Sequence, residues 1–176
     1  MASASDLEGQ SLAEIAEYHN DAVGALTFFL KSLFQQCDPR FLDWSLAEFN
    51  DLLLNRIEET DLRSSLAILA ALEAAVKIDY QLRARQRYKD ALSREFRATH
   101  KRKQDRVRLD EDLLEPWARH YPSLKSLIGE FCAALHFRHW LAHGRYWKRP
   151  VHRRFDYLSL YALAELALEQ FPLHRN

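Results

Sequence analysis

Glycine, proline and cysteine are scarce in this chain of 176 residues. It has 4 glycines and 5 prolines, too few for the many turns of an all-β sandwich. Its two cysteines, Cys37 and Cys132, have no metal-binding or disulfide spacing, which favours a reducing cytoplasm over an oxidising compartment. No apolar run approaches the roughly 18 residues of a membrane span, and the first residues lack the basic and apolar blocks of a signal peptide. We therefore expect a cytoplasmic protein that makes no membrane contact.

Residues that favour helix dominate the sequence, and apolar residues recur at spacings of three and four along most of it. This pattern predicts helices over residues 11–37, 41–59, 62–88, 109–121, 122–143 and 155–171. Thr60 or Asp61 would cap the third of these helices. Residues 90–108 fit either a basic helix or a mobile basic loop. The sequence therefore predicts an all-α bundle of about five or six helices, formed as one domain over residues 9–172 after a short flexible start at 1–8.

Charge is distributed unevenly, although the formal net charge is zero. Residues 1–79 hold 14 acidic and 5 basic side chains, whereas residues 80–176 hold 11 acidic and 20 basic ones. Eleven of these basic side chains lie within residues 83–108. Such a segment is typical of a surface that binds a polyanion, and a solvated helix surface explains it equally well.

An arginine interrupts the apolar stripe of the helix expected over residues 122–143. The stripe contains Leu124, Leu127, Ile128, Phe131 and Leu135. Arg138 continues it, within roughly 20° of Phe131. Because burying an unpaired guanidinium is costly, Arg138 needs a buried carboxylate, a subunit interface or an anion site. His143 points roughly 140° away on a continuous helix, so the two converge only if the helix opens or a second subunit faces it. Gly144 is expected to end the helix in a left-handed conformation.

Histidines in the same helix raise the question of a metal site. His136, His139 and His143 are spaced by three and four residues on one flank, as metal ligands can be. Trp140 follows His139, however, so the glutamate of the H-E-x-x-H motif is absent. Arginine and histidine also suit metal-free RNA cleavage, in which a base removes the ribose 2′-OH proton, an acid protonates the 5′-oxygen and a cation stabilises the phosphorane. We expect no metal and no cofactor.

The stretch "RHWLAHG", residues 138–144, resembles the R-x4-6-H motif of the HEPN superfamily. These are small α-helical proteins prominent in bacterial and archaeal defence and in toxin–antitoxin systems. Arg138 and His143 match the arginine and the histidine of the motif, and His139 stands where the family commonly has Asn, Asp or His. The resemblance implies a HEPN-like bundle and a metal-independent endoribonuclease that leaves a 2′,3′-cyclic phosphate and a 5′-hydroxyl. Two motifs would meet across a homodimer formed through the helix that carries Arg138 and His143. Arg138 would stabilise the phosphate, His143 would do acid–base work, and His139 would orient them.

The same resemblance implies supporting residues and a partner. An acidic residue on an earlier helix often contacts the motif, and Glu73 and Asp79 are the candidates, with Asp79 preferred. Either carboxylate equally suits a structural pair with Arg138 or Lys77. In one HEPN branch an antitoxin nucleotidyltransferase modifies a tyrosine two residues after the histidine. Here Tyr146 lies three residues after it, so modification of Tyr146 stays open. An antitoxin, either a nucleotidyltransferase or another protein, is the partner that this resemblance suggests.

RNA is the other expected partner. Basic side chains in two segments would hold its phosphates: Lys101, Arg102, Lys103, Arg145, Lys148 and Arg149. Trp147 and Tyr146 would stack on unpaired bases, whereas Trp140 is better explained by packing. Because some HEPN proteins have lost activity, the alternative is a non-catalytic module that binds RNA or protein.

Overall fold

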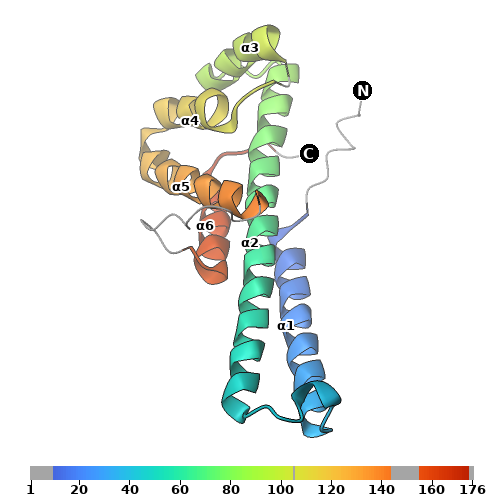
Figure 1. Ribbon diagram of the computed structural model, residues 1–176. Coiled ribbons are helices and arrows are strands. Elements are labelled where there is room, and N and C mark those ends of the chain that lie inside the picture. The colour runs from blue at the N-terminus through green and yellow to red at the C-terminus, as the bar shows by residue number, and fades with distance from the viewer. Residues whose placement is uncertain (1–9, 105, 144–154, 175–176) are drawn as a thin grey trace.

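The computed structural model describes residues 10–104, 106–143 and 155–174, and every regular element in these ranges is helical (Figure 1). The main helices are α1 (Leu12–Gln35), α2 (Leu46–Arg85), α3 (Ala91–Lys103), α4 (Glu115–His120), α5 (Lys125–Ala142) and α6 (Tyr157–Gln170). Short 3-10 turns at Pro39–Phe41 and Pro122–Leu124 and a π-helical turn at Leu109–Leu114 connect them. The all-α prediction is confirmed. None of the described helices combines the length and the apolar character that crossing a bilayer requires.

Helix α2 is the spine of the molecule. Its 40 residues extend over about 60 Å at 1.5 Å per residue. Its first half pairs with α1, and its second half contacts α3, α5 and α6 (Figure 1). We call residues 10–61 the hairpin and residues 62–174 the head. The site discussed below lies in the head.

Two matching capping boxes start the hairpin helices. The Ser11 hydroxyl accepts a hydrogen bond from the Glu14 backbone N–H at 3.2 Å, and the Glu14 carboxylate accepts one from the Ser11 N–H at 2.8 Å. Ser45 and Glu48 repeat this arrangement at the start of α2, with distances of 3.3 and 2.8 Å. Each box satisfies backbone donors that the first helical turn leaves without partners.

The predicted break near residue 60 is wrong, because the helices expected over 41–59 and 62–88 form the single helix α2. Thr60 is not a cap: its hydroxyl donates to the Arg56 carbonyl at 2.9 Å, one turn back in the same helix. Asp61 also lies inside α2. Burial is present on both sides of this region: Leu53 belongs to the hydrophobic cluster near the start of α2, with Ile57 packed against it, and Leu62 belongs to the larger cluster further along the helix. Packing along the whole length therefore outweighs the local capping preference.

The ambiguous basic segment is a helix over most of its length. The Asp90 side chain accepts a hydrogen bond from the Ser93 N–H at 2.8 Å, which caps α3. Leu92 and Phe96 on one side of α3 are buried, while most of its basic side chains are exposed. Burial of one apolar face thus explains why this segment is a helix, although its charges alone fit a helix and a loop equally well.

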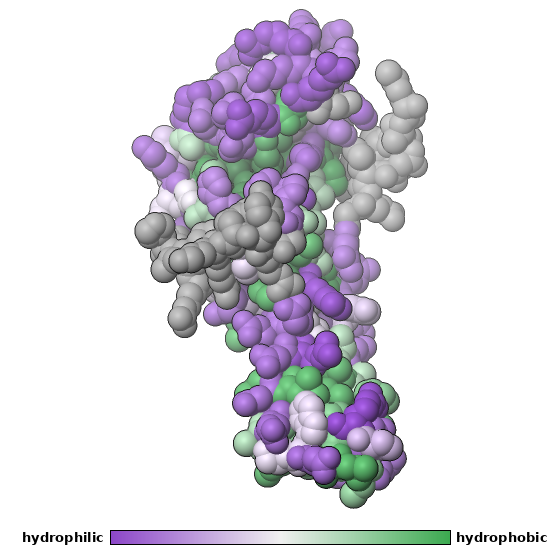
Figure 2. All heavy atoms as spheres, in the orientation of Figure 1, coloured by the Kyte–Doolittle hydropathy of each residue, from purple (hydrophilic) through white to green (hydrophobic). Residues whose placement is uncertain are grey.

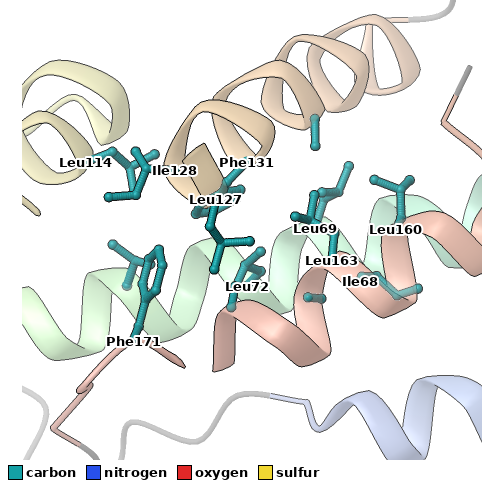
Figure 3. Close-up of a cluster of buried hydrophobic side chains, with 14 of the residues drawn as sticks. Ile68, Leu69, Leu72, Leu114, Leu127, Ile128, Phe131, Leu160, Leu163 and Phe171 are labelled. Carbon is teal, nitrogen blue, oxygen red and sulfur yellow. The ribbon is translucent and has the colours of Figure 1, made fainter. Parts of the chain in front are cut away.

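The hydrophobic side chains form two clusters of unequal size. The larger one lies in the head, where side chains from α2, α5 and α6 meet, among them Leu69, Phe131 and Leu160 (Figure 3). The smaller one lies in the hairpin and contains Leu30, Phe41, Phe49 and Leu53. Helix α5 is therefore packed on the larger of the two clusters.

Candidate functional site

The buried face of α5 rotates along the helix, and this decides where Arg138 lies. Leu127 and Phe131 point into the core in the first turns, but Phe137 and Trp140 do so near the end. Phe137 stacks on Trp140, with 5.6 Å between ring centroids, so Trp140 has the packing role expected of it. Arg138, the continuation of the predicted apolar stripe, is consequently half-buried, with 35% of its side chain exposed. The guanidinium thus lies at the rim of the core and not inside it.

Glu73 of α2 is the carboxylate that compensates Arg138. Arg138 Nη2 lies 3.2 Å from Glu73 Oε2, and Lys77 Nζ lies 2.6 Å from Glu73 Oε1. Both pairings considered for Glu73 from the sequence are therefore present. Neither Arg138 Nε nor Glu73 Oε2, both buried, makes a directed hydrogen bond with any described residue. The contact is an ion pair of imperfect geometry, in which the buried Nε of Arg138 has no acceptor among the described residues.

The preference for Asp79 as the partner of Arg138 is wrong. Asp79 is fully buried and accepts hydrogen bonds from Arg83 Nε and from the His174 backbone N–H, each at 2.8 Å. Burial raises the pKa of the Asp79 carboxyl, against the lowering effect of these two donors. Six residues separate Glu73 from Asp79, which places them about 120° apart around α2. Only Glu73 faces α5, and Asp79 belongs to a structural network.

A pocket of about 380 Å³ opens beside Arg138. Side chains of α2, the π-helical turn and α5 line it: Glu73, Leu109, Asp110, Cys132, Leu135, His136, Arg138 and His139. Burial, followed by the charges of Asp110 and Glu115, raises the pKa of the Cys132 thiol. Two histidines and an arginine face two carboxylates in this space, so the pocket suits a small polar group that carries both donors and acceptors.

The motif histidines lie in different surroundings. His139 lines the pocket next to Arg138, whereas His143 is not among the lining residues. The His139 and His143 rings contact each other, with 4.1 Å between centroids and 54° between planes. The His143 backbone N–H still donates to the His139 carbonyl at 3.1 Å, so α5 does not unwind before residue 143. Within one chain, His139 therefore lies between the pocket and His143.

Cys132 and Asp110 line the pocket but were not predicted to belong to the site. Cys132, His136 and His139 are spaced by four and three residues, which places them on one face of α5. This spacing was the signal that could have added Cys132 to the site. Asp110 had no such signal, because its place depends on how the π-helical turn packs. No three His, Cys, Asp or Glu residues in the described part of the chain are arranged to hold a metal ion.

The basic residues expected to bind RNA divide into two groups. Lys101, Arg102 and Lys103 are exposed at the end of α3, although Lys103 donates to Asp112 Oδ1 at 2.7 Å. The upper end of the molecule, over α3, is strongly hydrophilic (Figure 2). The expectations for Gly144, Arg145, Tyr146, Trp147, Lys148 and Arg149 fall outside the described residues.

Comparison of the chain with models of protein families, with curated proteins and with solved structures gives no match.

Proposed function

We propose that this protein is a metal-independent endoribonuclease that acts through Arg138, His139 and His143. The observation that carries the proposal is the position of Arg138 beside a pocket with His139, rather than deep in the core. His143 contacts His139 but does not itself line the pocket. A guanidinium for the phosphate and two imidazoles for proton transfer are the groups that the reaction needs. The resemblance of residues 138–144 to the HEPN motif points to the same chemistry.

The reaction involves no exchange of electrons with a cofactor. A histidine accepts the proton of the ribose 2′-OH, and the 2′-oxygen attacks the adjacent phosphorus. Arg138 stabilises the negative charge of the phosphorane. A second histidine protonates the 5′-oxygen as its bond to phosphorus breaks. A 2′,3′-cyclic phosphate and a 5′-hydroxyl result.

A second subunit would complete this site. In one chain Glu73 offsets the charge of Arg138, and His143 lies outside the pocket. A homodimer formed through α5 would bring the Arg138 and His143 of two chains to one cleft. RNA bound there would compete with Glu73 for the guanidinium, since a phosphate accepts paired hydrogen bonds from arginine.

The basic surface of α3 would hold more distant phosphates of the RNA. Lys101 and Arg102 are exposed and form no ion pair with the described residues. Arg145, Lys148 and Arg149 are proposed to extend this surface, and Tyr146 to stack on a base. Because phosphate contacts release counterions, binding should weaken steeply with salt. A role as a toxin or phage-defence effector, held by an antitoxin, belongs to this proposal.

Cleavage of a labelled RNA in the presence of EDTA tests the nuclease activity. Arg138→Ala, His139→Ala and His143→Ala should each lower the cleavage rate by about 100-fold or more, the usual effect of losing an acid, a base or a charge stabiliser. His136→Ala is the matched control, because His136 lines the same pocket but lies outside the motif. Equal cleavage by wild type and by the Arg138 and His143 variants would refute the proposal.

Chemical labelling of Cys132 tests whether RNA enters the pocket. In a Cys37→Ser background the thiol of Cys132 should react slowly with iodoacetamide at pH 7.5, because its raised pKa keeps it protonated. Bound RNA should slow the reaction further, since Cys132 lines the pocket. An unchanged rate would place the RNA elsewhere.

The alternative function is a non-catalytic module that binds RNA or protein. The Glu73 carboxylate favours it, because it already neutralises the one arginine of the motif. RNA binding that depends on Lys101 and Arg102 without any cleavage by wild type would establish this alternative.

A further inference from the structure

The outer face of α1 presents aromatic side chains to solvent. Tyr18, Phe28 and Phe29 are 73%, 76% and 54% exposed. On a helix, Tyr18, Ala22, Ala25 and Phe29 follow each other at spacings of four, three and four and form one stripe. Phe28 borders this stripe, which is about 16 Å long. An apolar stripe of three turns left exposed is typical of a surface that another helix covers.

The side chains of α1 that border this stripe are acidic, and Arg63 of α2, which lines a small pocket with Tyr18, is a basic neighbour at its start. Residues 10–30 contain no Lys or Arg, but they contain Glu14, Glu17 and Asp21. Glu14 is engaged in the cap of α1, whereas Glu17 and Asp21 are exposed and form no ion pair with any described residue. Asp21 lies three residues after Tyr18 and seven before Phe28, on the same side of α1. The stripe therefore combines apolar contact area with an excess of negative charge.

The hairpin as a whole has the same character. Residues 10–61 contain 10 acidic and 3 basic side chains, a balance of −7. Hydrophobic side chains also gather at the lower tip of the molecule (Figure 2), where Leu42, Trp44 and Leu46 are exposed. Two such hairpins would repel each other, and an anionic membrane would repel the hairpin as well. Charge thus argues against a second hairpin or an anionic lipid surface as the occupant.

We propose that the outer face of α1 is a docking site for a basic amphipathic helix of a partner protein. Apolar side chains of the partner at i, i+3 or i+4, and i+7 would pack between Tyr18 and Phe29. Lysines or arginines beside them would reach Glu17 and Asp21, and steer the encounter. This surface lies on the hairpin, away from the pocket of Arg138, so the proposal is independent of the proposed nuclease activity.

Fluorescence anisotropy with two synthetic helical peptides tests the proposal. Both have 18 residues with a Leu and Ala stripe, and one carries Lys where the other carries Glu at the flanking positions. The Lys peptide should bind the full-length protein with micromolar affinity, at least 10-fold tighter than the Glu peptide. The Phe28→Ser, Phe29→Ser double variant should weaken its binding at least 10-fold. The Glu17→Gln, Asp21→Asn double variant should weaken it several-fold and flatten its salt dependence.

Control variants distinguish binding at this site from nonspecific hydrophobic binding. Leu158→Ser removes a leucine of α6 that is 75% exposed but lies outside the hairpin, and it should bind the Lys peptide as wild type does. Because the substituted side chains of α1 are largely exposed, their loss should leave the circular dichroism spectrum and the thermal midpoint unchanged. Equal affinity for both peptides, no binding of the Lys peptide, or full binding by the Phe28, Phe29 variant would overturn the proposal. Sedimentation velocity adds one more outcome: a dimer that this variant dissociates would make a second copy the occupant, and the proposal would also fail.

Discussion

In the head, α2 is covered by α3, α5 and α6, whereas in the hairpin it pairs with α1. The head can therefore enclose a large apolar cluster and even a charged network around Arg83. The hairpin buries a small cluster and leaves Tyr18, Phe28 and Leu54 exposed. Two helices can cover only one face of each other, so the hairpin needs a further partner to bury the rest. Stability should consequently be concentrated in the head and binding capacity in the hairpin.

The largest loss of stability in the head is expected from a substitution of Arg83, whose side chain is only 2% exposed. It donates to Asp79 at 2.8 Å, to Ser93 at 3.1 Å and to the Pro172 carbonyl at 2.8 Å, and so joins α2 to α3 and to the C-terminal segment. Arg83→Ala leaves the Asp79 charge buried with too few partners, and should cost about 3–5 kcal/mol of unfolding free energy. Urea denaturation measures this loss.

Arg85→Ala is the matched control for Arg83, because Arg85 is exposed in the same last turn of α2. It should change the unfolding free energy by less than about 0.5 kcal/mol. Similar losses for both variants would mean that the network around Arg83 contributes little to the stability of the head.

Two buried phenylalanines test the unequal stability of the two regions. Phe96 lies in the head cluster, and Phe49 lies in the hairpin cluster, stacked on Phe34 with 4.4 Å between ring centroids. Phe96→Ala should cost about 3–5 kcal/mol and lower amide-exchange protection throughout the molecule. Phe49→Ala should cost less, about 2 kcal/mol, because its surroundings can relax toward solvent, and should lower protection over residues 46–57 more than over residues 68–82. Hydrogen exchange read by mass spectrometry gives both patterns, and a uniform effect of Phe49→Ala would show one cooperative unit.

Much of the fold was predictable because it depends on local patterns. The three-and-four spacing located the helices of both regions, and Ser11 with Glu14 marks a helix start that the structure contains. The continuity of α2 past Thr60 was not predictable in this way. Polar residues at 59–61 look like a boundary, and only packing against α1 on one side and α6 on the other keeps the helix intact.

The sequence indicated that Arg138 is unusual, but not which side chains it contacts. Periodicity singled out Arg138, but it placed Arg138 on the apolar face because it assumed a straight buried stripe. The actual face turns from Phe131 toward Phe137 and Trp140 as α5 crosses the head. The choice between Glu73 and Asp79 depends on the same crossing. No local pattern records how two helices cross, so the wrong carboxylate was preferred.

Long-range polar contacts were missed for the same reason. The buried His19 places Nδ1 3.0 Å from the Ser64 hydroxyl oxygen and stacks on Tyr157, with 3.8 Å between ring centroids. This cluster joins α1, α2 and α6 where the hairpin meets the head. Its members lie up to 138 residues apart in the numbering, from His19 to Tyr157 (157 − 19), and nothing near any of them in the sequence indicates the others.

The smallest expected effect is that of Thr60→Ala. The sign of its change in unfolding free energy distinguishes a continuous α2 from two separate helices. If Thr60 began a helix, Thr60→Ala would remove a cap and cost about 0.5–2 kcal/mol. Inside the continuous helix, its hydroxyl only donates to the Arg56 carbonyl, and alanine is the better helix former. We therefore expect Thr60→Ala to raise the unfolding free energy by less than about 0.5 kcal/mol. Ser45→Ala, which removes the actual cap of α2, should cost about 1 kcal/mol in the same urea titration. If the two variants lost equal stability, residue 60 would be a true helix start, and the spine that joins the hairpin to the head would be two helices.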